Sequence, residues 1–180
     1  MSDIIPENIN PSENLTRCIF HHLQYSRSKK KLKPTAFLPP PGRRDVSVLR
    51  RDYAPDDTFC KIHCQSIDIP GQTYVGIAVI LGQHIAASQE ANIDGVPISV
   101  QATPLDENNE KIFEETIYIT MPGLPMHADV LYEIPAPQKG ETSAKHRITA
   151  RFLCNIACFY LDEDSQSDIW TGAELIWNES

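Results

Sequence analysis

The sequence contains no long apolar run. Its longest apolar stretch, around residues 74–81, is far shorter than the roughly 20 residues that a membrane-spanning helix needs. Residues 1–12 also lack the positive start and apolar core of a secretory signal, because they are polar, acidic and contain prolines. We therefore expect a soluble protein of the cytoplasm with no membrane partner.

Several enzyme signatures are also missing. The chain has no phosphate loop of the GxxxxGK[ST] type, no GxGxxG fingerprint, no GxSxG turn and no HExxH pair. Nucleotide-hydrolysing, dinucleotide-binding and serine-hydrolase classes lose support by these absences. No internal repeat is present, so an array of repeated units is not expected.

Cysteines are few and odd in number. Five cysteines in a chain without an export signal favour free thiols over a disulfide framework. Cys60 and Cys64 are four apart on one predicted helix, and Cys154 and Cys158 are four apart on another, so each pair shares a helix face. Two facing helices would present four thiolates to a zinc or iron–sulfur centre, with His63 nearby. Helical pairs of this spacing are unusual metal ligands and cysteines are often buried, so we predict no cofactor and keep this metal site as the minor alternative.

The chain of 180 residues, 41% hydrophobic, fits one domain. We predict a disordered lead-in over residues 1–12 and a single α+β domain over residues 13–180. Strands are predicted at 15–23, 35–38, 45–50, 73–81, 96–102, 112–120 and 126–134. Helices are predicted at 55–67 and 140–160, with a shorter one at 83–91. Elements in no regular alternation indicate an α+β fold with two main helices and a mixed or antiparallel sheet of about five to seven strands.

The last predicted strand has the clearest alternation. His127 and Asp129 fall on one face, whereas Ala128, Val130 and Tyr132 fall on the other. The second set is apolar and should face the core. The first set is a candidate pair for proton transfer, with the carboxylate orienting the imidazole, and the alternative is a solvent-facing strand or a structural histidine.

Positive charge is concentrated near the N-terminus. Residues 1–51 carry a net charge of +6 and residues 52–180 a net charge of −14, which gives −8 overall. Between residues 27 and 51, nine Lys and Arg residues stand against one acid, Asp45. Such a segment can hold phosphates or dock an acidic protein, and the alternative is a solvated loop that offsets the acidic remainder. The residues expected to form this basic N-terminal face are Lys29, Lys30, Lys31, Lys33, Arg43, Arg44 and Arg51.

Four short motifs recur in an order that resembles a protein family. They are Arg17-Cys18-Ile19, Ala36-Phe37 with Pro39, Ser47-Val48-Leu49-Arg50, and Pro125-Met126-His127-Ala128-Asp129-Val130. The order resembles a group of small bacterial proteins with an early Arg-x-Ile, a Phe-x-Pro before Ser-Val-x-Arg, and a later Pro-x-His-Ala-acid-aliphatic stretch. The match spans residues 15–160, and this chain departs from it in its long basic connector and in an Asp at position 129 where the group has Glu. The resemblance implies no particular activity, but it nominates Arg17, Ser47, Arg50, His127 and Asp129 as site residues.

Two main functions follow from these features. A binding module that docks an acidic partner or nucleic acid through residues 27–51 is favoured, because no catalytic motif is strong. The alternative is a small enzyme for a phosphorylated or nucleotide-like substrate, in which arginines bind phosphate and the His127–Asp129 pair transfers protons. Regular alternation puts Ser47 and Arg50 on opposite strand faces, which counts against both joining one site. Whether the basic side chains cluster on one surface or scatter should distinguish the two functions.

Overall fold

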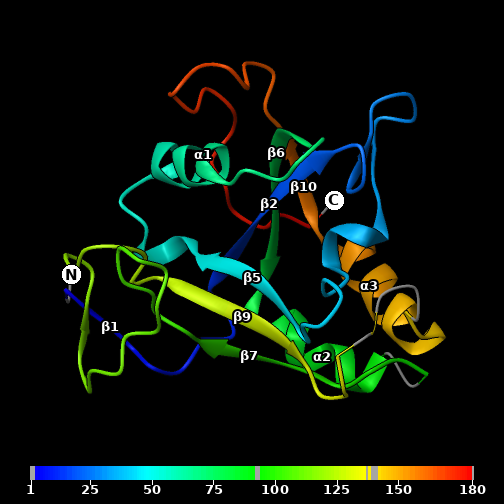
Figure 1. Ribbon diagram of the computed structural model, residues 1–180, viewed down its shortest axis with the longest axis horizontal. Helices are drawn as coiled ribbons and strands as arrows, with labels where there is room; N and C mark the ends of the chain where they lie inside the picture. The colour runs from blue at the N-terminus through cyan, green and yellow to red at the C-terminus, as the bar shows by residue number, and fades with distance from the viewer. Residues whose placement is uncertain (1–2, 92–93, 137, 139–141, 180) are drawn as a thin grey trace.

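A mixed sheet of eight strands forms the centre of the molecule (Figure 1). The computed structural model describes residues 3–91, 94–136, 138 and 142–179. The strands of the sheet are β2 (Asn14–His21), β3 (Tyr25–Ser26), β4 (Lys31–Leu32), β5 (Asp45–Arg50), β6 (Thr73–Leu81), β7 (Ile98–Ala102), β9 (His127–Tyr132) and β10 (Cys158–Leu161). Six of them lie in the order β10-β6-β2-β5-β9-β7, and β3 and β4 form a hairpin beside β2. The predicted α+β class is confirmed, with somewhat more strands than expected.

A two-stranded sheet and the helices complete the fold. The small sheet pairs β1 (Ile4–Ile5) with β8 (Ile117–Tyr118). The helices are α1 (Asp57–Ser66), α2 (Gly82–Ala91) and α3 (Ala144–Ile156), with short 3₁₀ helices η1 (Pro34–Phe37) and η2 (Arg51–Tyr53). In the described parts of the chain, no helix is long and apolar enough to cross a membrane.

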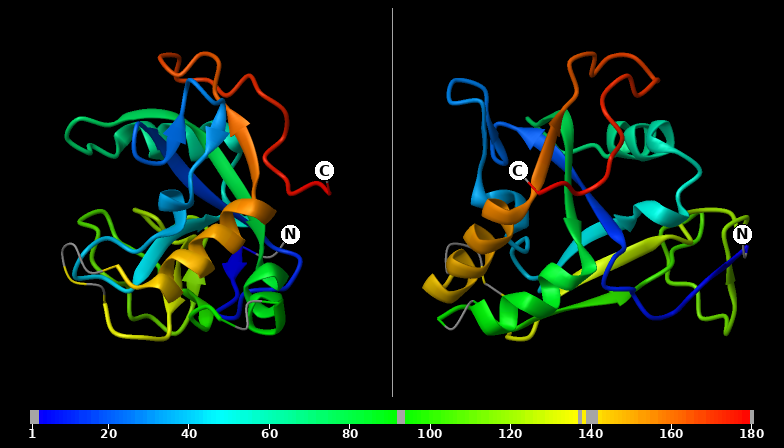
Figure 2. Two further views of the ribbon diagram at one scale, coloured as in Figure 1. Left: turned by 90° about the vertical axis from the view of Figure 1, so that its right-hand side faces the viewer. Right: turned by 180° about the vertical axis from the view of Figure 1, so that it is seen from behind.

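The helices cover both faces of the main sheet (Figure 2). On one face, Cys64 of α1 and Leu175 of the C-terminal segment are buried in a cluster with Cys18. On the other face, Leu153 of α3 belongs to a cluster with Leu15, to which α2 and η1 also contribute. The strand β6, which lies between β10 and β2, is therefore covered on both faces, which explains why its sequence is apolar without alternation.

The sheet divides where β2 meets β5. These strands pair at only two positions, Leu15 with Arg50 and Thr16 with Leu49, and then diverge. Each strand has its longer ladder with the neighbour on its other side, β2 with β6 and β5 with β9. The divergence opens a fork between β2 and β5 that is visible in Figure 1.

Local signals predicted several elements well. The strands at 45–50 and 73–81 have the expected bounds. At the N-terminus of α1, the Asp56 carboxylate accepts a hydrogen bond of 2.7 Å from the Phe59 amide, and Ser143 caps α3 in the same way. Side-chain oxygens at these positions bind amides that have no partner within the helix, so the helices begin at Asp57 and Ala144 and not at the predicted residues 55 and 140.

The prediction of one helix over 140–160 is wrong in its last turn. The helix α3 ends at Ile156, and residues 158–161 form β10 against the edge of β6. Gly140 lies outside the described residues. Phenylalanine and tyrosine favour strands, and an edge of β6 without a partner would expose its backbone groups, so pairing in the sheet overrides the helical spacing. Gly76 permits the approach, because a Cβ there would lie 2.2 Å from the carbonyl oxygen of Tyr160.

Two other expectations differ from the structure. Residues 35–38 were expected to form a strand, but Pro34–Phe37 is a 3₁₀ helix, because proline at its first position presets a helical φ. Most of the strand expected at 112–120 is loop, and only β8 remains. Residues 3–12, taken from their composition as a lead-in, contain β1, and the Arg50 guanidinium donates hydrogen bonds to the carbonyls of Pro6 and Asn8.

Candidate functional site

The basic residues between 27 and 51 lie at several separate places. Lys29, Lys30 and Lys31 belong to the β3–β4 hairpin, which projects from the body of the molecule at the upper right of Figure 1. Arg43 and Arg44 precede β5 and are exposed at its start, far along the strand from Arg50 and Arg51 at its end.

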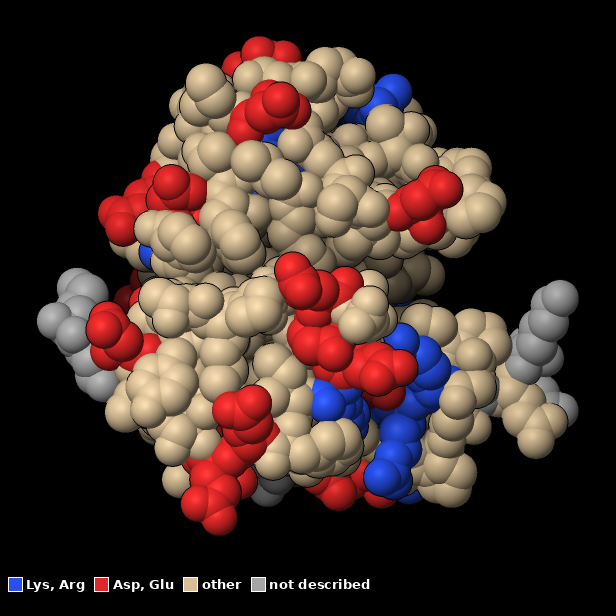
Figure 3. All heavy atoms as spheres, turned by 60° about the vertical axis from the view of Figure 1, so that its left-hand side comes forward, with Lys and Arg blue, Asp and Glu red and all other residues tan. Residues whose placement is uncertain are grey.

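The last two arginines of the segment are occupied by carboxylates. Arg50 is 0% exposed and binds Glu13 through Nε and Nη2, both at 2.8 Å. Arg51 is paired with Asp57 at the start of α1. On the face in Figure 3, Lys and Arg form a patch bordered by Asp and Glu, not a continuous basic surface.

The cysteine expectations are corrected by a disulfide. Cys18 of β2 is bonded to Cys64 of α1, so the five cysteines are not all free thiols. Cys60 is buried on α1, whereas Cys154 and Cys158 lie on α3 and β10. The four-thiolate site fails because α1 and α3 cover opposite faces of the sheet and because Cys64 is already bonded. Within the described residues, no three His, Cys, Asp or Glu side chains converge as a metal site would need. Disulfides are more common in oxidising compartments, and a cytoplasmic location stays a prediction.

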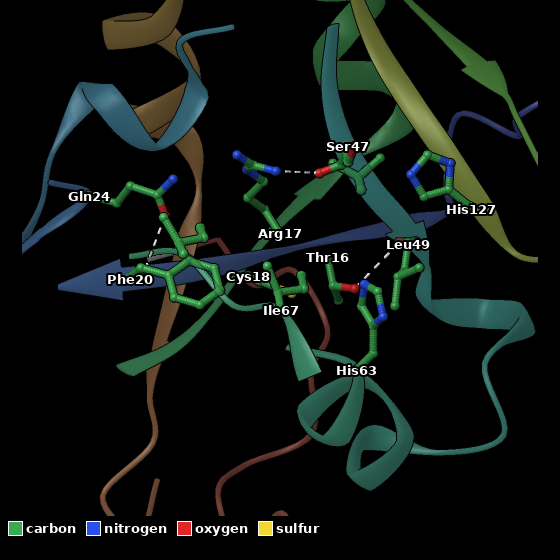
Figure 4. A pocket seen from close by; sticks show the side chains of 12 residues that line it. Thr16, Arg17, Cys18, Phe20, Gln24, Ser47, Leu49, His63, Ile67 and His127 are labelled. Carbon is green, nitrogen blue, oxygen red and sulfur yellow. Dashed lines mark hydrogen bonds between the residues drawn. The ribbon is translucent and has the colours of Figure 1, made fainter. Parts of the chain in front are cut away.

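A pocket of about 170 Å³ occupies the fork between β2 and β5 (Figure 4). Its walls come from β2, from β5 and β9, and from α1 with the segment that follows it. The residues that line it are Thr16, Arg17, Cys18, Phe20, Gln24, Ser47, Val48, Leu49, His63, Ile67, Ile69 and His127. Pockets that enclose a whole drug-sized ligand are roughly 300–1,000 Å³ in volume, so this one suits a single group such as a phosphate.

Arg17 supplies the positive charge of the pocket. Its Nε donates to the carbonyl of Ala36 at 3.0 Å, and its Nη1 donates to the carbonyl of Ser47 at 2.8 Å, where β5 has lost its pairing with β2. Its Nη2 has no hydrogen-bond partner among the residues that the structure describes. Burial, and then the nearby Arg43, lower the pKa of Arg17 to about 10, so the guanidinium remains charged at neutral pH. Arg17 is therefore a cation whose position in the pocket wall is fixed by two backbone carbonyls.

His127 is held by Thr103 of the segment that follows β7. Its Nδ1 lies 2.9 Å from the Thr103 carbonyl oxygen, and because a carbonyl only accepts hydrogen bonds, Nδ1 carries the proton. Nε2 therefore keeps its lone pair, 3.9 Å from the nearer carboxylate oxygen of Asp129. The pKa of His127 lies below its ordinary value, because the lowering by burial exceeds the raising by Asp129 and the Thr103 carbonyl. The ring is thus a neutral proton acceptor with a carboxylate beside it that stabilises the imidazolium.

Asp129 is not part of the pocket lining but contacts the side chains of Thr103 and Ser47 beside it. Its Oδ2 accepts a 2.9 Å hydrogen bond from the Thr103 hydroxyl, and its Oδ1 lies 3.4 Å from the Ser47 hydroxyl. The antiparallel register of β5 and β9 produces this arrangement, because Ser47 is opposite Asp129 and Leu49 is opposite His127. Both residues of the predicted His–Asp face are largely buried, so the alternative of a solvent-facing strand is wrong for them.

The structure brings together most, but not all, of the nominated residues. Arg17, Ser47 and His127 line the pocket, and Asp129 contacts Ser47. Arg50 is absent from the lining of the pocket and lines a separate groove beside the N-terminal segment. The opposite orientation of Ser47 and Arg50 expected from strand alternation explains this separation.

His63 was not nominated from the sequence as a residue of this site. It lies on α1, on the opposite wall from His127, and points toward Leu49 and Thr16 in Figure 4. Burial, and then His127, lower the pKa of His63 to about 4. The sequence signal for His63 is that it directly precedes Cys64. This position indicates that His63 lies near the pocket only once the disulfide between Cys64 and Cys18 is known.

Comparison with known proteins identifies no relative: no family model, no curated protein and no solved structure matches this chain. The resemblance to a bacterial group therefore stays a prediction. What the arrangement can do chemically follows from its groups, which are a fixed guanidinium, a neutral histidine with a carboxylate, and a hydroxyl around a space of phosphate size.

Proposed function

We propose that this chain is an enzyme acting on a phosphorylated substrate, with the phosphoryl group bound at Arg17 and a proton transferred by His127. The observation that carries the proposal is the convergence of Arg17, Ser47 and His127 on one pocket, from strands that are far apart in the sequence. In contrast, the basic residues expected to form one docking face are separated, and three arginines of that segment, Arg43, Arg50 and Arg51, are paired with acids.

Each group has a role in this function. The Nη2 of Arg17 donates to a phosphoryl oxygen, in the geometry for which guanidinium groups are suited. The Nε2 of His127 accepts a proton from the attacking hydroxyl, and Asp129 stabilises the imidazolium that results. The Ser47 carbonyl fixes the Arg17 guanidinium, and the Ser47 hydroxyl donates to Oδ1 of Asp129 at 3.4 Å and so helps to orient that carboxylate.

Binding of inorganic phosphate tests the first half of the proposal. In amide NMR spectra, phosphate should shift the resonances of residues that line the pocket, and Arg17→Met should weaken this binding at least tenfold. Arg151→Met is the matched control, because Arg151 is exposed on α3, outside the pocket. Equal binding by wild type and Arg17→Met, or shifts confined to residues outside the pocket, would show that phosphate binds elsewhere.

Turnover of a panel of phosphate monoesters and diesters tests the second half. Loss of a positioned proton-transfer group typically costs about 10²–10⁴ in rate, so His127→Gln should lower kcat by that factor. The amide of glutamine can still donate to the Thr103 carbonyl, which preserves the local structure. An activity that survives His127→Gln would rule out this assignment.

A binding role for the lysine-rich hairpin is the second candidate function. It is favoured by the placement of Lys29, Lys30 and Lys31 together on the projecting β3–β4 hairpin, with exposed side chains. This narrower surface replaces the whole of residues 27–51 as the proposed contact with an acidic protein or nucleic acid.

Filter binding with short RNA and DNA at two salt concentrations tests this role. Replacing the three hairpin lysines by glutamine should abolish salt-sensitive binding, while Arg43→Gln with Arg44→Gln should change it little. If both variants lose binding to the same extent, the contact is not specific to the hairpin.

A further inference from the structure

We propose that His63 is a second proton-transfer residue of the pocket, and that the substrate is a phosphodiester whose phosphoryl group lies between His63 and His127. The proposal rests on the phosphate-binding function described above. It adds a second catalytic group, the class of ester and the kind of substituent that the ester carries.

His63 lines the pocket, and its imidazole is available for hydrogen bonding to a ligand. Neither of its ring nitrogens has a hydrogen-bond partner among the described residues, whereas the ring of His127 is anchored to Thr103. The disulfide between Cys18 and Cys64 joins the two walls of the pocket immediately beside Arg17 and His63. The second imidazole is therefore held near the guanidinium and remains available to a ligand.

Protonation of one imidazole makes protonation of the other less favourable. His127 contributes to the lowered pKa of His63, and burial lowers the pKa of both rings. The charged groups around them are Arg17 on β2, Arg43 and Asp45 at the start of β5, Asp129 on β9, and Asp106 and Glu107 of the loop beside His63. An anion between the rings favours one imidazolium, while mutual repulsion keeps the other ring neutral. One acid and one base are the combination that transfer of a phosphoryl group between two oxygens requires.

The reaction balances with water or a substrate hydroxyl as the nucleophile. The attacking oxygen forms a bond to phosphorus as its proton passes to the Nε2 of neutral His127. The bond between phosphorus and the leaving oxygen breaks, its electron pair stays on that oxygen, and the oxygen takes a proton from the imidazolium of His63. Arg17 holds a non-bridging oxygen throughout, and proton exchange with solvent restores both rings.

Two further grooves adjoin the pocket, and Ile67 lines all three spaces. One, of about 510 Å³, shares Phe20 and Ile69 with it, and the other, of about 440 Å³, shares His63. A diester bound in the pocket would extend one substituent into each groove.

Both grooves carry carboxylates. The larger groove is lined by Asp68 and Asp168, and the smaller by Asp106 and Glu107. Additional phosphates would be repelled there, so the substituents are uncharged or cationic. The substrate class is a small single phosphodiester and not a nucleic acid strand.

Histidine titrations by NMR, with and without inorganic phosphate, test the two-histidine arrangement. A bound anion stabilises the imidazolium, so phosphate should raise the pKa of both His63 and His127 by about one unit or more. His84 is an internal control, because it packs against Trp177 outside the pocket and its titration should not move.

The possible results separate this proposal from the function on which it rests. If phosphate binds in an Arg17-dependent manner but leaves the titration of His63 unchanged, the second histidine is refuted and the phosphate site stands. If phosphate changes neither histidine nor any pocket amide, the proposed function fails and this inference fails with it.

Competition between ligands tests the substrate class. A dinucleoside monophosphate, which has one phosphodiester and two uncharged arms, should bind at least tenfold more tightly than inorganic phosphate and should displace it from the pocket. An oligonucleotide of ten residues should bind more weakly per chain than this diester. Tighter binding of the oligonucleotide at the pocket would overturn the assignment to a small diester.

Discussion

Arg17 and Arg50 differ in how completely their guanidinium groups are bound. Arg50 donates to both carboxylate oxygens of Glu13 and to the carbonyls of Pro6 and Asn8, and the ring of Tyr53 lies 4.6 Å from its central carbon. Arg17 donates to two carbonyls and keeps one terminal nitrogen for a ligand. The same residue type therefore anchors the N-terminal segment at one position and offers a binding group at the other.

This contrast predicts that Arg50→Met destabilises the protein without weakening phosphate binding. The substitution leaves the Glu13 carboxylate, whose side chain is 4% exposed, without its partner, and breaking a buried pair in this way costs about 3–5 kcal/mol. Denaturant unfolding measures the loss, and phosphate titration of the folded protein should give an affinity close to that of wild type. A tenfold loss of affinity would place Arg50 in the site.

His63 should make the stability of the protein depend on pH. Its pKa is lowered from 6.5 to about 4 by burial, so between these values the unfolded chain binds a proton that the folded chain does not. The free energy of unfolding should therefore fall as the pH drops from 6.5 towards 4. After allowance for the partial exposure of the ring, the contribution is about 2 kcal/mol.

The variant His63→Gln isolates this contribution from those of the other histidines. Its free energy of unfolding, measured by denaturant at a series of pH values, should fall less steeply over that range than that of wild type. Parallel curves for the two proteins would mean that His63 titrates in the folded state as it does in the unfolded chain.

The disulfide joins two elements, α1 and β2, that the sequence places 46 residues apart. Closing a loop of this length reduces the entropy of the unfolded chain by an amount worth about 4 kcal/mol at 25 °C. Replacing Cys18 and Cys64 together by alanine should reduce the free energy of unfolding by about this amount, in denaturant titrations without reductant. Cys158→Ala is the control, because this free thiol lies at the sheet edge, away from α1. An unchanged midpoint for the double variant would mean that the bond adds nothing to stability.

Local patterns located the strands of the site but not their partners. The alternation over residues 126–134 put His127 and Asp129 on one face, and the predicted strand at 45–50 is observed as β5. The two strands that form the β5–β9 side of the pocket could therefore be derived from the sequence. The pairing of β5 with β9 could not, because these segments are about 80 residues apart and no local signal selects a distant strand.

The position of Arg17 in the pocket could not be predicted from the sequence for a different reason. Alternation along β2 puts it on the face of Leu15 and Ile19, whereas Cys18 faces α1. Arg17 nevertheless lines the pocket because β2 and β5 diverge after two paired positions. Divergence depends on the twist of the whole sheet and on what fills the fork, so the pattern of a single strand does not predict it. His63 joins the site for a similar reason, since its position depends on how α1 packs against the sheet.

A buried ion pair joins α1 to the segment that follows β10. Lys61 is 0% exposed, and its Nζ lies 3.0 Å from the Oδ2 of Asp162. The same nitrogen donates to the carbonyls of Asp164 at 2.8 Å and Ile169 at 3.0 Å. One ammonium group thus binds three points of the C-terminal segment, which in turn supplies Leu175 to the core around α1.

Removing either charge should therefore loosen the C-terminal segment from α1. Lys61→Met leaves Asp162 charged and buried, and Asp162→Asn leaves the ammonium without its counter-charge, so each should cost about 3–5 kcal/mol in denaturant unfolding. The double variant should cost less than the sum of the single ones, because neither remaining side chain is then an unpaired buried charge. Hydrogen exchange should show faster exchange of the Trp170 amide, which donates to the Thr58 hydroxyl on α1. Strictly additive losses would mean that Lys61 and Asp162 stabilise the protein independently of each other. Lys61 would then hold the C-terminal segment through its hydrogen bonds to the two carbonyls and not through its charge.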